Sequence, residues 1–290
     1  MYYSFLYNKN MRIGIDLGGT NYRIGLVDDD NSIVSLLKKK SETNEGEIIL
    51  NNIVEDLKQF DLSSVSSIGF CAPGYIDSKN LTISDTSNLI IKDKLEVGKA
   101  IRTIFNGEIK MDNDANCAGL AEAINGAGKD YHNVYYITHS TGIGASFIEN
   151  GIIKHGSHNV LGEIGSCLLN KEPKIRLEKS SAGPAIKNKG MELLNLQSSE
   201  EVFEKAKQGD EIALNILEEV FSNLAFTIAN ICYIVDPDCF VLGGGISNNF
   251  DFYYPILMKY FKYYASEYSE VVPIKKAILE EPGVLGASLL

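Results

Sequence analysis

The stretch "IGIDLGGTN", residues 13–21, decides how the chain begins to fold. Apolar and small residues lead into an aspartate, and two glycines, a threonine and an asparagine follow at once. The first part predicts a buried strand, and the paired glycines predict a tight turn, because glycine adopts backbone angles that other residues avoid. The pattern "YRIGLV", residues 22–27, resumes the strand, so the stretch predicts two strands joined by a glycine turn.

A second stretch repeats this pattern near the middle of the chain. In "YYITHSTGIGASFI", residues 135–148, one strand pattern leads into a serine, a threonine and a glycine, and another strand pattern follows. This weak internal repeat predicts two related α/β halves. Their two glycine hairpins would then face each other across a cleft.

The rest of the chain alternates helix and strand patterns, as is typical of α/β folds. Apolar residues recur at helical spacing between residues 45 and 60. Asn150-Gly151 predicts a hairpin turn, and Ser198 with Glu201 predicts a capping box at the start of a helix. The residues predicted to face inward on a long helix over 210–234 are Ile212, Ile216, Leu217, Val220 and Leu224.

Composition excludes several classes of protein. The 290 residues are 44% hydrophobic, which is enough for two domains or one large one with a sizeable core. A net charge of -11 argues against nucleic acid or an anionic membrane as a main partner, since both repel an acidic surface. No run of about 18 apolar residues is seen, so no membrane span is expected.

The cysteines and the first residues indicate the compartment. The 5 cysteines are scattered and odd in number, which predicts free thiols in a reducing, cytoplasmic environment. The opening "MYYSFLYNKN" lacks the basic region and long apolar run of a secretory signal. Met11 stands directly before the first predicted strand, so residues 1–10 are interpreted as an extension that the fold does not need.

Glycine turns between strands are suited to binding phosphate. Backbone N–H groups can approach an anion closely where no side chain intervenes. With the hydroxyls of Thr20, Ser140 and Thr141, the two turns could hold a polyphosphate, and Asp16 could hold its metal ion through water. The alternative, that both are ordinary hairpin turns, stays open on these residues alone.

Further motifs follow in a fixed order and resemble the ROK family of repressors, open reading frames and kinases. The first turn resembles the phosphate loop of the sugar kinase, heat-shock ATPase and actin superfamily. The motifs that narrow the resemblance to ROK proteins are "IGFCAPGYID" (68–77), "SNLI" (87–90), "DNDANCAGLAE" (112–122), "GEIG" (162–165), "LEKSSAGPAI" (177–186), "DPDCFVLGGGIS" (236–247) and "GVLGAS" (283–288). The resemblance runs from Arg12 to the end of the chain.

The resemblance implies a fold, an activity and partners. The fold would be an α/β, two-domain actin-like (ribonuclease H-like) ATPase fold with an interdomain cleft. Its smaller domain would span 11–115 and its larger domain 116–280, with a C-terminal helix at about 281–290 packing back on the smaller one. The activity would be transfer of the γ-phosphoryl group of ATP, bound with Mg²⁺, to the 6-hydroxyl of a hexose.

The aspartate that opens the helix after residue 113 has two interpretations. As a helix N-terminal acid, Asp114 would cap the helix and offset its dipole. As a general base, it would take the proton of a sugar hydroxyl while that oxygen attacks phosphorus. The resemblance favours the base, and Asn113 would then hydrogen-bond the neighbouring hydroxyl.

The resemblance also assigns the remaining site residues. Carboxylates suit sugar hydroxyls because they only accept hydrogen bonds, although Glu178 alone, in a charged run, would be interpreted as solvated surface. The substrate-binding residues implied are Gly74, Ser87, Asn88, Asn113, Asp114, Glu163, Ser166 and Glu178. The nucleotide-binding residues implied are Asp16, Gly18, Gly19, Thr20, Asn21, Thr138, Ser140, Thr141, Gly142, Gly144, Gly243, Gly244 and Gly245.

The chain departs from the family pattern at the zinc site of many ROK proteins. Ser166 stands where the family has a histidine, and Cys167 is the one cysteine in the segment that follows. One thiol and no histidine cannot form a closed four-ligand zinc site, so no zinc is expected. His155 and His158 could be taken for metal ligands, but positioning of a loop is the plainer interpretation.

Several functions compete. A ROK repressor would need a DNA-binding domain before the kinase-like fold, and the ten residues before Met11 leave no room for one. A catalytically silent sugar sensor, or polyphosphate as donor, stays open. Glucose is the first expectation for the substrate, and N-acetylmannosamine is the alternative because of Ser87 and the missing zinc histidine. Family members are commonly homodimers, and the tyrosine-rich stretch 250–268 is either part of that interface or an ordinary helix with buried aromatics.

Overall fold

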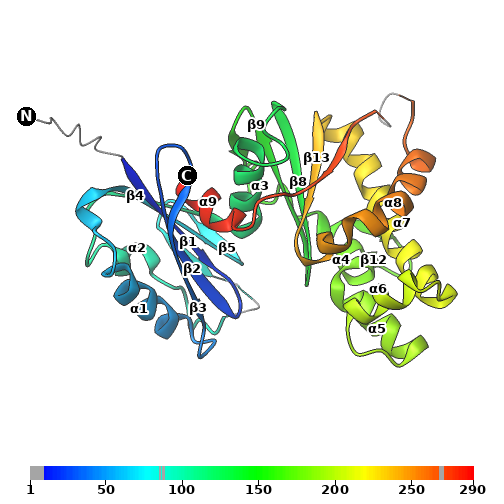
Figure 1. Ribbon diagram of the computed structural model, residues 1–290, viewed down its shortest axis with the longest axis horizontal. Helices are drawn as coiled ribbons and strands as arrows, with labels where there is room; N and C mark the ends of the chain where they lie inside the picture. The colour runs from blue at the N-terminus through cyan, green and yellow to red at the C-terminus, as the bar shows by residue number, and fades with distance from the viewer. Residues whose placement is uncertain (1–9, 85, 87–88, 268–270) are drawn as a thin grey trace, which may run out of the picture. The chain divides into compact units, whose positions relative to one another are not determined.

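The computed structural model describes residues 10–84, 86, 89–267 and 271–290. The chain forms two compact units, shown in Figure 1. Unit 1 contains the chain up to Ala121 together with Leu279–Leu290, and unit 2 contains Glu122–Ile278. The expected mixed α/β architecture is confirmed, because each unit has its own five-stranded sheet and its own hydrophobic core.

The sheet of unit 1 has the strand order β3-β2-β1-β4-β7. The predicted hairpin is confirmed, since the first two strands pair antiparallel up to Leu17 and Tyr22 on either side of the glycine turn. The third strand pairs antiparallel with the second, and the last two strands run parallel to the first. The bounds are β1 Met11–Leu17, β2 Asn21–Val27, β3 Ile33–Lys40, β4 Val65–Ala72 and β7 Glu108–Asn113.

Helices α1 and α9 pack on the sheet of unit 1. Helix α1 (Gly46–Leu57) places Ile49, Leu50 and Ile53 in the core. Helix α9 (Pro282–Ser288) packs directly on strand backbones (Figure 1). The shorter elements of unit 1 are η1 Leu62–Ser64, β5 Tyr75–Asp77, β6 Thr82–Ser84 and α2 Val97–Ile101.

Glycines make that close packing of α9 possible. Gly25, Gly14 and Gly69 lie side by side on three neighbouring strands. A Cβ on Gly14 would come within 1.8 Å of the Val284 carbonyl oxygen, and one on Gly69 within 1.7 Å of that of Ala287. Both separations are far shorter than van der Waals contact, so any side chain would push the helix off the sheet.

The sheet of unit 2 repeats the design of the first. Its order is β10-β9-β8-β13-β14, with the first two pairings antiparallel and the last two parallel. The predicted internal repeat is therefore confirmed in strand order and direction. The predicted hairpin turn is also confirmed, because Asn150 and Gly151 have φ of 52° and 74°. The bounds are β8 Asn133–His139, β9 Ile143–Glu149, β10 Ile152–Lys154, β13 Cys239–Gly243 and β14 Ile274–Lys276.

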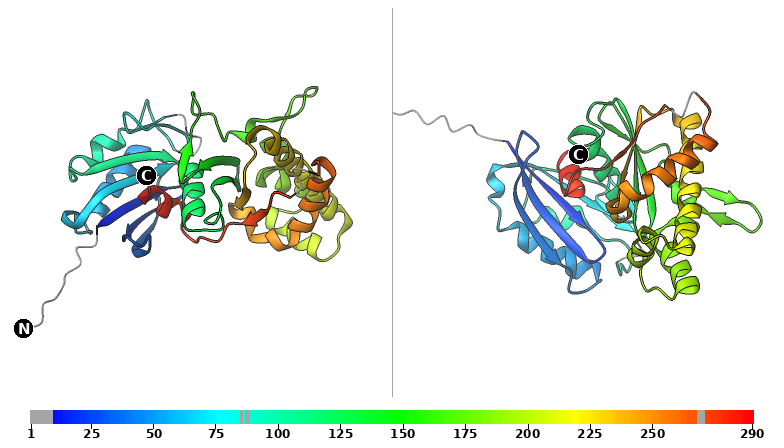
Figure 2. Two further views of the ribbon diagram at one scale, coloured as in Figure 1. Left: turned by 90° about the horizontal axis from the view of Figure 1, so that it is seen from above. Right: turned by 45° about the vertical axis from the view of Figure 1, so that its right-hand side comes forward.

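Helices pack on this second sheet around the long helix α7. Phe221 of α7 stacks on Tyr253 of α8 with ring centroids 4.1 Å apart. A short hairpin, β11 with β12, reaches away from the rest of unit 2 (Figure 2). The other bounds are α3 Asp114–Ile124, which begins in unit 1, and in unit 2 η2 Ile164–Ser166, β11 Leu168–Asn170, β12 Ile175–Arg176, α4 Leu177–Ser181, α5 Gly183–Leu194, α6 Ser199–Lys207, α7 Glu211–Val235, η3 Gly245–Asn249 and α8 Phe250–Tyr264.

Three details of the helices differ from the expectations. Ile212 is 43% exposed, because the buried face of α7 begins with Ala213 instead. The capping box is half formed: Ser198 Oγ accepts from Glu201 N at 3.2 Å, but the Glu201 carboxylate accepts from Gln197 N. Helix α7 also passes the length and composition test for a membrane-crossing helix, which the sequence analysis did not note, and 56% of its most apolar window is buried inside the protein, as in the core helix of a soluble protein.

Candidate functional site

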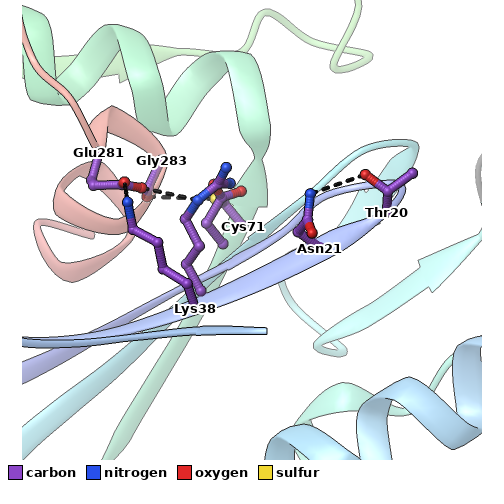
Figure 3. A network of polar contacts seen from close by, with 8 residues as sticks. Thr20, Asn21, Lys38, Cys71, Glu281 and Gly283 are labelled. Carbon is purple, nitrogen blue, oxygen red and sulfur yellow. Dashed lines mark hydrogen bonds and ion pairs between the residues drawn. The ribbon is translucent and has the colours of Figure 1, made fainter. Parts of the chain in front are cut away.

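The first glycine turn connects β1 to β2 through Gly18, Gly19 and Thr20. Gly18 N donates to the Asn21 carbonyl at 2.9 Å, which closes the turn. Thr20 and Asn21 are exposed, and the Asn21 amide donates to Thr20 Oγ1 at 3.0 Å (Figure 3). The turn thus exposes a hydroxyl and an amide beside partly exposed glycine backbone, a combination that suits an anion.

Asp16, one residue before the end of β1, is held on both carboxylate oxygens. Arg23 Nη1 donates to Oδ2 at 3.0 Å, and the Cys71 thiol lies 3.5 Å from Oδ1. The side chain of Asp16 is 17% exposed. Burial raises the pKa of Asp16 above its usual value, and the Arg23 guanidinium partly offsets that rise.

Sequence reasoning missed the charged network around Asp16. Arg23 Nε also contacts Glu281 Oε2 at 3.0 Å, and Lys38 pairs with the other oxygen of Glu281 (Figure 3). The register of the predicted hairpin could have revealed the contact between Arg23 and Asp16, because it places the two residues directly opposite each other. Glu281 comes from the segment before α9 and could not be placed without the tertiary structure.

Asn113 and Asp114 lie where β7 ends and α3 begins. Asp114 is exposed, and its Oδ1 accepts from Ala115 N at 2.8 Å. Asn113 Oδ1 accepts from the same N–H at 2.9 Å. Asp112, which sequence reasoning did not single out, is 6% exposed and accepts from Asn113 N and Asn116 Nδ2, each at 2.7 Å. The buried carboxylate of Asp112 therefore fixes the junction, and the carboxylate of Asp114 is exposed to solvent.

The remaining residues of unit 1 that are predicted to bind sugar follow β4 in the sequence. Gly74 has φ of 101°, a left-handed angle that favours glycine, and it joins β4 to β5. Ser87 and Asn88 lie outside the described residues.

In unit 2 the structure brings the two predicted nucleotide-side glycine segments together. Ser140, Thr141 and Gly142 join β8 to β9, and Ser140 N donates to the Gly142 carbonyl at 2.9 Å. Thr138 and Gly144 pair across the two strands at the base of this turn.

The triple-glycine segment packs on that turn. Gly243 ends β13, and Gly244 has φ of 83°. A Cβ on Gly244 would lie 2.5 Å from the His139 carbonyl oxygen, and one on Gly245 would lie 3.4 Å from Ser140 Oγ. Glycine is therefore required at 244 both for its backbone angle and for this close approach.

Glu163 is presented on a segment that lies directly on β9. A Cβ on Gly162 would come within 2.1 Å of the Ala145 carbonyl oxygen, and one on Gly165 within 2.4 Å of that of Ile143. The glutamate between these glycines is exposed. Ser166 is exposed too, and its carbonyl accepts from Arg176.

Glu178 is not the solvated surface residue that its charged neighbours suggest. It lies on α4, is half-buried, and its Oε2 accepts from Ile143 N at 3.0 Å. Its carboxylate therefore reaches the first residue after the Ser140–Gly142 turn. The flanking sequence gave no signal of this bond.

His139, the last residue of β8, is a second buried group that sequence reasoning missed. It is 1% exposed, and its Nε2 lies 2.7 Å from the Ser181 carbonyl of α4. Burial lowers its pKa to about 4, so the ring is neutral at pH 7 and donates this bond from Nε2–H. Among the described residues, no group of three or more His, Cys, Asp or Glu side chains could hold a metal ion.

Comparison with known proteins gives the relationship of the chain. The sequence model of the ROK family matches residues 12–290. A glucokinase of Halalkalibacterium halodurans is 29% identical over 290 residues, covering 87% of this chain and 86% of that protein. An N-acetyl-D-glucosamine kinase of Haemophilus influenzae is 27% identical over 302 residues, covering 97% of this chain and 99% of that protein.

A solved structure agrees with the expected fold. The crystal structure of a ROK hexokinase from Thermus thermophilus superimposes with a TM-score of 0.86 at 25% identity, covering 96% of this chain and 97% of that one. The expected α/β fold of the actin-like ATPase type is confirmed by this match.

Proposed function

The chain belongs to the ROK family, and on that premise we propose that it is an ATP-dependent sugar kinase that phosphorylates the 6-hydroxyl of a hexose. The names of the relatives support a sugar kinase, since one is a glucokinase and another an N-acetyl-D-glucosamine kinase. The observation that carries the proposal is Asp114, an exposed carboxylate at the β7–α3 junction that is backed by a buried, hydrogen-bonded Asp112.

Asp114 is the general base in this proposal. It takes the proton from the sugar hydroxyl as that oxygen attacks the γ-phosphorus. Asn113, whose Oδ1 is held by the Ala115 N–H, uses its amide hydrogens to orient the neighbouring hydroxyl. Such positioning supplies much of the rate in phosphoryl transfer, because the protein does little covalent chemistry there.

The glycine turns bind the nucleotide. The β1–β2 and β8–β9 turns offer the hydroxyls of Thr20, Ser140 and Thr141 to the phosphates, together with backbone N–H groups other than those of Gly18 and Ser140, which close the turns. Gly243, Gly244 and Gly245 let adenosine lie against backbone.

The residues present also fit Mg²⁺ that arrives with the nucleotide. Magnesium in such sites keeps several waters and uses one or two carboxylates plus substrate phosphates, and Asp16 is one partly exposed carboxylate beside a phosphate-binding turn. When bound, the ion neutralises charge on the phosphates. Asp16 would hold it through water, and Arg23 keeps that carboxylate oriented.

Glucose is the first candidate substrate, and N-acetylated hexosamines are the alternative. The exposed Glu163, Ser166 and half-buried Glu178 supply acceptors for sugar hydroxyls. The relative named N-acetyl-D-glucosamine kinase aligns over almost the whole chain and brings that sugar into consideration. N-acetylmannosamine remains in consideration because Ser166 replaces the family histidine.

We also propose a cytoplasmic homodimer that associates through unit 2. Support comes from apolar side chains exposed on α7 and α8, where Tyr233 is 60%, Ile234 82% and Tyr263 81% exposed. Other aromatics of α8, such as Tyr253, are buried in the core, so only part of the tyrosine-rich stretch is available to a partner. Light scattering of the purified chain measures its mass in solution and so tests whether it is a dimer.

The decisive experiment measures ADP release from Mg-ATP with glucose, mannose, fructose, N-acetylglucosamine and N-acetylmannosamine. We expect turnover with one of them. Asp114→Asn should fold normally and lose about 100-fold or more in kcat, the scale of general-base catalysis. Near-normal turnover in this variant would remove Asp114 from the base role. No turnover with any sugar, in a folded protein that still binds one, would replace the kinase by a sugar sensor.

A further inference from the structure

The carboxylate of Glu178 accepts a hydrogen bond from the protein backbone, in addition to its proposed role as a sugar ligand. Its Oε2 accepts from the backbone N–H of Ile143 at 3.0 Å, across 35 residues of chain. Glycines surround it, because a Cβ on Gly142 would come within 2.8 Å of the same oxygen and a Cβ on Gly165 within 3.2 Å. The carboxylate thus lies against the turn that the proposed function gives to the phosphates.

Two further bonds tie the segment that carries Glu178 to the same turn. The Ser181 carbonyl, at the end of α4, lies 2.7 Å from His139 Nε2. Gly183 N, at the start of α5 and two residues after the end of α4, donates to the Ser140 carbonyl at 2.8 Å. Contacts before, within and after the turn therefore fix α4 and the turn as one body, with Glu178 as the charged link.

The link to Ile143 is strong for its kind. A carboxylate that accepts from a backbone N–H makes a charge-assisted hydrogen bond. Ile143 is 3% exposed, so removing the carboxylate would leave a buried N–H without this acceptor, which is unfavourable. The turn would then lose the hydrogen bond that fixes it where it leads into β9.

We propose that Glu178 is a positioning residue of the phosphate turn as well as a sugar ligand, and that it couples sugar binding to nucleotide binding. This inference rests on the proposed function. Oε2 holds the turn, and within the part of the chain that the structure describes Oε1 accepts no hydrogen bond, which leaves that oxygen for a sugar hydroxyl. A sugar that fixes the carboxylate also fixes the turn, so each ligand strengthens binding of the other by the same factor.

The test is calorimetric binding of Mg-AMPPNP without sugar and then with saturating sugar. Without sugar, Glu178→Ala should weaken nucleotide binding about tenfold or more, as expected for loss of a charged hydrogen bond. Glu178→Gln keeps a carbonyl acceptor and should stay within about threefold of the wild type. In the wild type, sugar should tighten nucleotide binding, and Glu178→Ala should abolish that effect.

Glu163→Ala is the matched control, because Glu163 lies on the sugar side and its side chain makes no capping bond to η2. It should weaken sugar binding and leave sugar-free nucleotide affinity within about twofold. Amide hydrogen exchange at Ile143 gives a readout free of ligand. This amide should be protected in the wild type and in Glu178→Gln, and should exchange faster in a folded Glu178→Ala.

The outcomes separate the inference from the function on which it rests. If the wild type binds no Mg-AMPPNP, the proposed kinase fails. If the wild type binds it and a folded Glu178→Ala binds it equally well without sugar, the inference is overturned. If Glu178→Ala does not fold, a wild type whose nucleotide affinity is the same with and without sugar overturns the coupling.

Discussion

The two sheets of this protein have the same strand order and directions but fill their middle strands differently. In unit 1, Gly14 and Gly69 pair across β1 and β4 and leave room for α9. In unit 2, the matching strands pair Tyr136 of β8 with Val241 of β13 on the face turned away from that unit's main core. The same framework thus holds either glycines beneath a helix backbone or larger buried side chains at that place.

The two glycine turns also differ, in the origin of the acidic residue that lies beside each. The acid at the first turn, Asp16, lies on the turn's own strand and pairs with Arg23 only 7 residues away. The acid at the second turn, Glu178, comes from a helix 35 residues along the chain. Leu17 precedes the first turn and the buried His139 precedes the second. The backbone framework is repeated, whereas the charges around it are not.

The largest effect is expected from a substitution that puts a side chain where the sheet of unit 1 has a glycine. Gly69→Ala forces a Cβ to within 1.7 Å of the Ala287 carbonyl oxygen, so α9 must move away from the sheet. We expect the free energy of unfolding to fall by about 3 kcal/mol or more. Chemical denaturation measures it, with Ser35→Ala on the exposed strand β3 as control. An unchanged midpoint would show that unit 1 accommodates the methyl group without displacing α9.

His139→Leu makes the second turn resemble the first. The pKa of His139 is lowered to about 4 in the folded protein, against about 6.5 when unfolded. Between these values the unfolded state binds the extra proton, so wild-type stability falls as pH drops from 6.5 to 4, by up to about 3 kcal/mol from this group.

The leucine variant should lack this part of the pH dependence, although loss of the bond to the Ser181 carbonyl lowers its stability at pH 7. Urea denaturation between pH 4 and 7 compares the two proteins. Parallel stability curves would mean that the histidine is not buried and neutral as the structure has it.

The smallest effect is expected from the charges at the first turn. Arg23→Gln removes the partner of the partly buried Asp16 and of Glu281, and should lower the free energy of unfolding by about 1–2 kcal/mol. Lys38→Gln is the matched control: it also contacts Glu281 but is 58% exposed, so its effect should stay below about 0.5 kcal/mol. Thermal denaturation at low and high salt compares the two variants. Equal losses of stability would show that Arg23 contributes no more than the exposed Lys38 does.

Local pattern was sufficient for much of the fold. The β1–β2 and β8–β9 hairpins, the Asn150-Gly151 turn and the long helix over 211–235 follow from apolar spacing and glycine placement, which act between neighbours in sequence. Errors arose at element edges: Ile212 was predicted to be buried and is exposed, because periodicity alone does not fix which of two adjacent apolar residues points inward.

The sequence by itself determined the repeated strand–turn–strand framework, the family, and the candidate residues in the two glycine turns and at Asn113-Asp114. Only the tertiary structure decided which charges meet. Glu281 reached Arg23, and Glu178 reached Ile143, through folding of distant segments onto the sheets. Hairpins and helices are fixed by interactions between near neighbours, whereas a carboxylate finds its donor only when packing brings two remote backbones within hydrogen-bond distance.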